Sequence, residues 1–294
     1  MVNEVTTIDT NNYAIMAKAM GMAGESSSDD KPNTLPRFRI NHSPIIGSDK
    51  VLVKGGTYKL EIPDDTTLYG TSATIRPFIQ RFMYKRFVKN MSAKQGEPLG
   101  VYHKTIMSDN LNVDLKDNQG KFNCGKPTGY IKDFKALPVD TQDVIRQIKR
   151  VRVIFGTVDL VGSVDESGNK VEKGTIPFIW EIDNRDAFKT MGEPFRKFSQ
   201  VKRLPVEHSI ALNTEERKLP NGNSFYLPTY TLDLQDKIEV SKDDQDTFIN
   251  FMSWIDNYNT YIYNEWDMKT KKDISDSDKN VVDNFIDVTE EDVA

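Results

Sequence analysis

The 294-residue chain contains very little cysteine or histidine. Cys124 is its one cysteine, and the three histidines, His42, His103 and His208, lie far apart. A single cysteine excludes a disulfide framework and a zinc site built from several cysteines. No two histidines have the H-x-x-H or H-E-x-x-H spacing of a metal site, so we expect neither a metal nor another cofactor.

Long apolar runs and catalytic motifs are also missing. No stretch approaches the ~18 consecutive apolar residues of a membrane-spanning helix, and the N-terminus lacks the basic segment and apolar run of a signal peptide. The chain has no P-loop, no nucleophile elbow and no histidine-centred triad spacing. We therefore expect an intracellular protein that is not an enzyme and is not inserted in a membrane.

A magnesium-dependent nuclease is the enzyme class that the acidic residues leave open. Magnesium is bound by carboxylates and waters. The carboxylates that would have to meet around the ion are Asp64, Asp65, Asp159, Glu181 and Asp183. The first two fit a turn and the last two fit the solvated end of a strand, so catalysis is not favoured.

Charge is distributed unevenly along the chain. Residues 1–34 carry 2 Lys/Arg against 5 Asp/Glu, residues 35–240 carry 32 against 25, and residues 241–294 carry 5 against 14. A basic body followed by an acidic segment often marks a nucleic-acid surface combined with an interaction tail.

The segment from Ile75 to Lys89, IRPFIQRFMYKRFVK, contains basic and aromatic residues and no acidic one. In an interface with a single nucleic-acid strand, cations follow the phosphates while rings stack on the bases. The candidate phosphate ligands are Arg76, Arg81, Lys85, Arg86 and Lys89, and the candidate stacking rings are Phe78, Phe82 and Tyr84. Further candidates for phosphate contact outside the segment are Arg37, Arg39, Lys149, Arg150 and Arg152. The competing interpretation is that the rings are buried and the charges are simply solvated.

Two periodicities fit this segment. As a strand, it places Ile75, Ile79 and Met83 on one side and the three candidate rings on the other. As a helix, it would bury Phe78 and Phe82 together with the isoleucines. The β-branched and aromatic residues favour the strand, and the binding hypothesis depends on this phase.

Strand patterns dominate residues 35–240. Alternating or β-rich runs separated by turn residues predict hairpins, including one across Asn221-Gly222, and Asp140 and Asn184 are suited to begin short helices. We expect a mainly β domain with added helices, an α+β fold, over residues 35–240. A flexible arm, residues 1–34, precedes it.

The C-terminal segment divides into a helix and a tail. Over residues 241–270, Phe251, Ile255 and Tyr258 belong to a set of apolar residues at helical spacing, which predicts an amphipathic helix. Residues 271–294 are mostly acidic and polar and cannot fold alone, so we expect a disordered acidic tail. Its candidate partner-binding residues are Asp283, Phe285, Ile286, Asp287, Glu290, Glu291 and Asp292.

Several segments together resemble the replication-type single-stranded DNA-binding proteins of tailed bacteriophages. They are LPRFRI at Leu35–Ile40, TIRPFIQRFMY at Thr74–Tyr84, CGK at Cys124–Lys126, IPFIWEI at Ile176–Ile182, and the tail from Asp273. The resemblance spans roughly residues 35–234 and implies an OB-like curved β-barrel whose open face holds an oligonucleotide. More strands are expected than the five of such a barrel, so additions to it are expected too.

The resemblance also implies a function and partners. The protein would bind and protect single-stranded DNA during phage replication and recombination, in the cytoplasm of the infected host cell. Replication or recombination proteins would bind the acidic tail, which would also compete with DNA for the groove, and the chain could form homo-oligomers. The alternative is a structural or assembly protein of the virion, because strand-rich folds with flexible arms serve there too.

Overall fold

The computed structural model describes residues 34–92, 98–219 and 222–272. The expected arm, apart from Thr34, and residues 273–294 of the expected tail lie outside these ranges. The described residues from Leu35 onward belong to one compact unit. Its fold is mixed α/β, with about 36% strand and 26% helix. None of the described helices is long and apolar enough to cross a membrane.

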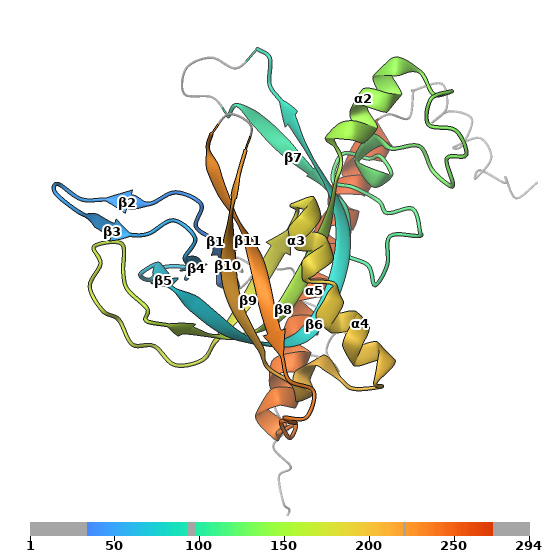
Figure 1. Cartoon of the computed structure of the whole chain (residues 1–294). Coiled ribbons are helices and arrows are strands. Elements are labelled where there is room, and N and C mark those ends of the chain that lie inside the picture. Colours follow the sequence, from blue (N-terminus) through green and yellow to red (C-terminus); the bar gives the residue numbers. More distant parts are fainter. Residues whose placement is uncertain (1–33, 93–97, 220–221, 273–294) are drawn as a thin grey trace, which may run out of the picture. The chain divides into compact units, whose positions relative to one another are not determined.

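Nine strands form one large sheet in the order β11-β10-β6-β8-β9-β1-β4-β5, with β7 paired to β6 (Figure 1). These strands are β1 (Arg37–Ile40), β4 (Tyr58–Glu61), β5 (Leu68–Gly70), β6 (Ser72–Lys89), β7 (Gly100–Lys104), β8 (Lys149–Val161), β9 (Ile176–Ile182), β10 (Ile210–Lys218) and β11 (Ser224–Leu232). The short strands β2 (Ile45–Ile46) and β3 (Val51–Val53) form a separate hairpin. The β1–β9 pair is parallel, whereas β6, β8 and β9 are antiparallel neighbours.

The helical elements are η1 (Asn123–Gly125), α2 (Val139–Gln147), α3 (Arg185–Thr190), α4 (Glu193–Gln200), η2 (Pro205–Glu207) and α5 (Lys242–Lys272). The helix predicted near Asp140 is confirmed, and Asn184 caps α3 by accepting the backbone N–H groups of Asp186 and Ala187 at 2.9 and 3.1 Å. The antiparallel β10–β11 pair that was predicted is also present.

The sheet curls so that distant members of the strand order meet. The Tyr58 hydroxyl in β4 donates to the Asn213 carbonyl in β10 at 2.9 Å, and the Thr214 hydroxyl donates to the Gly56 carbonyl just before β4. These strands stand far apart in the strand order, so only curvature can bring them together. The structure confirms the expected strand-rich fold as a mixed α/β fold with one large sheet and a C-terminal helix.

Nearly every strand contributes to one aromatic-rich core. Phe38 stacks on Tyr58 with ring centroids 5.0 Å apart, and Trp180 meets Phe38 edge-on at 5.0 Å. The helices α3 and α4 complete this core with Ala187 and Phe198, among others. Burial of these rings fixes β1, β4 and β9 relative to one another.

The helix α5 covers a second core, along β6 and β8 (Figure 1). Its Phe251 ring lies 5.7 Å from the Phe78 ring and 5.8 Å from the Phe155 ring, measured between centroids. In β8, Val153 and Phe155 face this core while Ile154, between them, faces the first core. The predicted amphipathic helix is therefore confirmed, and it packs on the body.

The segment from Ile75 to Lys89 is a strand, as predicted, but the predicted division of its faces is wrong. The register of β6 against β8 shifts between Pro77 and Ile79, which is a β-bulge. Beyond the bulge the side chains change sides, so Phe78 joins Ile79 and Met83 in the core under α5. A strand covered on both faces has no free side from which all three predicted rings could reach DNA.

Replacement of Phe251 by alanine should destabilise the whole unit. The side chain is 1% exposed, and truncating a buried phenylalanine typically costs ~3 to 5 kcal/mol. The free energy of unfolding from urea titration measures the effect. Phe248→Ala on the same helix is the control, because Phe248 is 45% exposed and its truncation should cost under ~0.5 kcal/mol. An equal loss of unfolding free energy in both variants would contradict the described packing of α5 on β6 and β8.

Candidate nucleic-acid interface

Two of the three predicted stacking rings are buried, and the third is partly covered. Phe78 and Tyr84 are buried, and the Tyr84 hydroxyl donates to the Leu111 carbonyl at 3.2 Å. Phe82 is half-buried against the Phe188 ring of α3, at 6.1 Å between centroids. The prediction that Phe78 and Tyr84 stack on bases is therefore wrong, because α5 covers the first ring and the loop around Leu115 covers the second.

Arg76 is also committed within the protein. Its guanidinium contacts both carboxylate oxygens of Asp244 in α5, at 2.7 and 3.0 Å, and its Nε donates to the Val206 carbonyl at 2.7 Å. These contacts tie the first turn of α5 to β6. Arg76 therefore acts as a structural anchor and is not a free phosphate ligand.

Two further predicted arginines are buried. The guanidinium of Arg152 lies beside the rings of Phe82 and Phe188, 5.1 and 4.5 Å from their centroids, and burial lowers its pKa to about 10. Arg86 is 9% exposed, with its Nη2 3.4 Å from Nδ1 of His103. Neither side chain can meet a phosphate without leaving the core, so both predicted contacts are wrong.

Arg81 and Arg150 lie outside the hollows described next. Arg81 is half-buried and reaches toward the Met252 sulfur of α5. Arg150 is exposed on β8.

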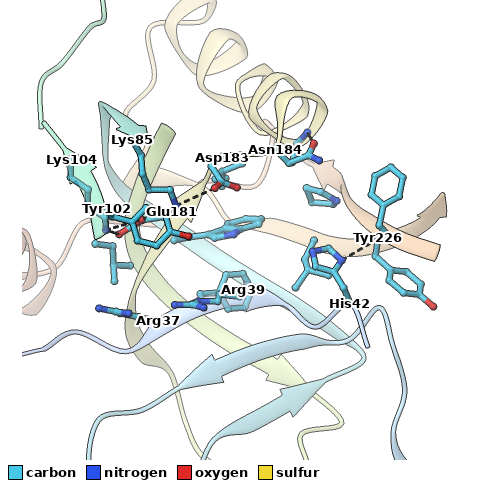
Figure 2. A pocket seen from close by; sticks show the side chains of 18 of the residues that line it. Arg37, Arg39, His42, Lys85, Tyr102, Lys104, Glu181, Asp183, Asn184 and Tyr226 are labelled. Atoms are coloured by element: carbon cyan, nitrogen blue, oxygen red, sulfur yellow. Dashed lines mark hydrogen bonds and ion pairs between the residues drawn. The ribbon is translucent and has the colours of Figure 1, made fainter. Parts of the chain in front are cut away.

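Three of the remaining predicted cations, Arg37, Arg39 and Lys85, line a cleft of about 780 Å³ (Figure 2). It is bordered by β1, β7, the end of β9, the start of α3 and the β10–β11 hairpin. Its charged and aromatic lining residues include Arg37, Arg39, His42, Lys85, Tyr102, Lys104, Glu181, Asp183, Phe225 and Tyr226. Figure 2 shows Tyr102 and Lys104 at one end of this cleft and Tyr226 at the other.

A second hollow of about 590 Å³ shares Lys85 and Tyr102 with the cleft. Its other polar and aromatic lining residues are Phe87, Lys89, Gln147 and Lys149. Because two residues line both hollows, the hollows are neighbours, and we call the two together the groove. Five of the predicted phosphate ligands line this groove: Arg37, Arg39, Lys85, Lys89 and Lys149.

Exposed rings stand beside these cations. Tyr102 is 52% exposed and Phe87 is 38% exposed, and their ring centroids lie 5.1 Å apart across the β6–β7 pair. The Lys85 ammonium lies 5.1 Å from the centroid of the Tyr102 ring. Tyr226 lies near His42, whose Nδ1 accepts the Tyr226 backbone N–H at 3.2 Å. Burial lowers the pKa of His42, so its imidazole is neutral near pH 7.

Carboxylates lie among the groove lysines. Lys104 contacts Glu181 at 3.0 Å, Lys149 contacts Asp183 at 3.1 Å, and Lys85 reaches both acids at 3.6 and 3.1 Å. Burial by itself would raise the pKa of both carboxyls, but the ammonium groups outweigh it and the pKa of each is lowered. Both acids are therefore ionised at neutral pH.

The carboxylates considered for a magnesium site do not gather. Asp65 pairs with Lys173, Asp159 accepts the Thr175 hydroxyl at 2.7 Å, and the two groove acids are occupied by lysines. Across the part of the chain that the structure describes, no group of three or more His, Cys, Asp or Glu is placed to hold a metal.

Sequence reasoning missed the rings and one lysine of the groove. Phe87 lies near the end of the basic segment, away in sequence from the apolar residues Phe78, Ile79 and Met83 that pack under α5. This position could have indicated that its ring is exposed. Tyr102 and Lys104 carry no such signal, because only the pairing of Phe87 with Tyr102 across β6 and β7 brings them to the groove. Comparison with known proteins finds no matching family model, no matching curated sequence and no matching solved structure.

The Arg76–Asp244 pair makes a testable contribution to stability. Burial would raise the pKa of Asp244, but hydrogen bonds from Ser241 and the Arg76 charge lower it. A lowered carboxyl pKa stabilises the fold above the ordinary value of about 4, and this stabilisation is lost as the pH falls further. Asp244→Asn should therefore cost about 1 kcal/mol at pH 7, and urea titrations should show the difference shrinking below about pH 4.

The control for this experiment is Glu215→Gln. Glu215 pairs with Arg217 at 3.1 Å, and both side chains are more than half exposed. Its replacement should change stability by under ~0.5 kcal/mol at every pH. A loss in Asp244→Asn that stays constant from pH 7 to pH 3 would mean that the ion pair is not its cause.

Proposed function

We propose that the chain binds single-stranded DNA in the groove and has no catalytic role. The observation that carries this proposal is the placing of two exposed rings, Phe87 and Tyr102, among cations from β1, β6, β7 and β8. Cations hold the phosphates of any sequence, and rings stack on unpaired bases. In a duplex the bases are stacked on one another, so this combination suits a single strand.

The groove residues have different roles in this proposal. Arg37, Arg39 and Lys89 are exposed and contact phosphates directly. Tyr102 and Phe87 each present a ring face to a base, which is worth ~1 to 3 kcal/mol per stacked base. Tyr226 offers a third ring at the opposite end of the cleft, where Figure 2 shows it pointing away from Lys85.

We propose further that the curled sheet works as an OB-type barrel with additions, as the resemblance to phage single-stranded DNA-binding proteins implies. The hydrogen bonds between β4 and β10 support this assignment, because they join distant parts of the strand order. The groove lies where strand faces and hairpins meet, which is where OB-type proteins hold oligonucleotides. In that role the protein protects single-stranded DNA during phage replication and recombination.

The acidic tail has two roles in this proposal. Residues 273–294 carry eight acidic residues and one lysine, so they attract the groove cations and compete with DNA. Extended, these residues reach up to about 70 Å from Lys272, enough to cross a domain. When DNA displaces the tail, the segment around Phe285 and Ile286 is free to recruit replication or recombination proteins.

Removal of the groove rings tests the binding site. Tyr102→Ala and Phe87→Ala should each weaken binding to oligo-dT about tenfold in fluorescence anisotropy titrations, because each removes a stacking platform. Tyr130→Ala is the matched control, since Tyr130 is 89% exposed and lines neither hollow. Wild-type protein with no salt-sensitive affinity for oligo-dT would refute the proposed function. If it is also found in purified virions, the structural or assembly role would be favoured.

Truncation after Lys272 tests the proposed role of the tail. The shortened chain should bind oligo-dT several-fold more tightly than the full chain at low salt, and the two should converge as salt screens the competition. The same titration on both proteins measures this difference. Equal or weaker binding by the shortened chain would remove tail competition from the account and leave the groove assignment standing.

A further inference from the structure

The groove contains three lysines whose charges are already balanced in part. Lys85, Lys104 and Lys149 share two carboxylates, Glu181 and Asp183. Lys104 reaches both oxygens of Glu181, at 3.0 and 3.2 Å. These five side chains form one connected network, which we call the lysine–carboxylate cluster.

The backbone fixes the cluster in place. Glu181 is the last outward residue of β9, between the buried Trp180 and Ile182, and Asp183 follows two positions later on the same side. Lys85 and Lys149 are directly opposite each other in the β6–β8 register. Like charges in that arrangement repel, and Asp183 accepts from both lysines at 3.1 Å.

A single DNA strand bound in the groove would reach the lysine–carboxylate cluster. Lys85 and Glu181 line the same cleft as Arg37 and Tyr102, and the cation–ring contact of Lys85 with Tyr102 joins the cluster to the proposed stacking site. The carboxylate side chains are 29% and 31% exposed, so they face an incoming phosphate and not the core. Phosphates near these lysines must therefore approach two fixed negative charges.

We propose that Glu181 and Asp183 are built-in counter-ions of the groove, which restrain its affinity for the phosphates of a single DNA strand. This inference rests on the proposed function. Lysines held by carboxylates neutralise few phosphates and so displace few condensed counter-ions from the DNA, and they add little to affinity or to its salt dependence. Arg37 and Lys89, which are exposed and form no salt bridge within the described residues, then carry most of the phosphate contact.

The test is the double variant E181Q/D183N of the full chain. Glutamine and asparagine keep the shape of the side chains and free the lysines for phosphate. The variant should bind oligo-dT roughly tenfold more tightly than wild type at low salt. The slope of log K against log salt should steepen by about 0.7 for each lysine that gains a phosphate contact. Anisotropy titrations at four salt concentrations measure both quantities.

The control variant is E172Q/E193Q, which removes the same charge elsewhere. Glu172 and Glu193 pair with Lys170 and Arg196 on the exposed surface and line neither hollow. A general charge effect would strengthen binding equally in both double variants and would overturn the counter-ion role.

Each remaining outcome also decides the matter. Binding by E181Q/D183N that is unchanged, weaker, or tighter without a steeper slope would overturn the inference while leaving the proposed function intact. Wild-type protein that does not bind oligo-dT would refute the proposed function itself. If the double variant unfolds, the single variants E181Q and D183N give the same comparison, since each frees Lys104 or Lys149 alone.

Discussion

The packing of α5 against β6 and β8 determines which side chains of β6 are left to contact a ligand. Phe251 and Ile255 bury the apolar side of the strand, and the two-point contact between Arg76 and Asp244 holds the first turn of the helix. Burial of this kind contributes ~1.5 to 3 kcal/mol for each large side chain. Aromatic residues that a free strand would present to a ligand are therefore used for folding.

The groove begins where this cover ends. The last part of β6 leaves the two cores and pairs with β7, and there Phe87 and Tyr102 are exposed while Lys85 and Lys89 lie beside them. The other wall comes from β1 and the β10–β11 hairpin, which the curl of the sheet brings near. Curvature and strand pairing thus assemble the proposed site from segments far apart in the sequence.

The sequence predicted which segments are strands and helices better than it predicted which of their side chains are exposed. The long strand through Ile75–Lys89 and the amphipathic C-terminal helix were predicted correctly, because period and composition are local properties. The bulge at Pro77–Ile79 was not, and it reversed the expected exposure of Phe78. No local pattern shows that Arg76 will meet an aspartate on α5, since that contact depends on tertiary packing.

The cations of the candidate site were also predicted from the sequence only in part. Arg37, Arg39, Lys85, Lys89 and Lys149 were predicted as phosphate ligands, and all five line the groove. Arg86 and Arg152 are as basic in sequence, yet both are buried against rings or histidine. Charge alone therefore does not show which basic side chains are buried and which are solvated. The planar guanidinium of arginine suits the interior contacts that Arg86 and Arg152 make.

Photo-cross-linking tests the central claim most directly. Ultraviolet irradiation of the full chain bound to oligo-dT, followed by mass spectrometry of the cross-linked peptides, identifies the side chains that touch bases. The groove account predicts cross-links at Phe87 and Tyr102, with Tyr226 as a further site. Cross-links confined to α5, to Tyr130 or to other surfaces outside the groove would contradict it.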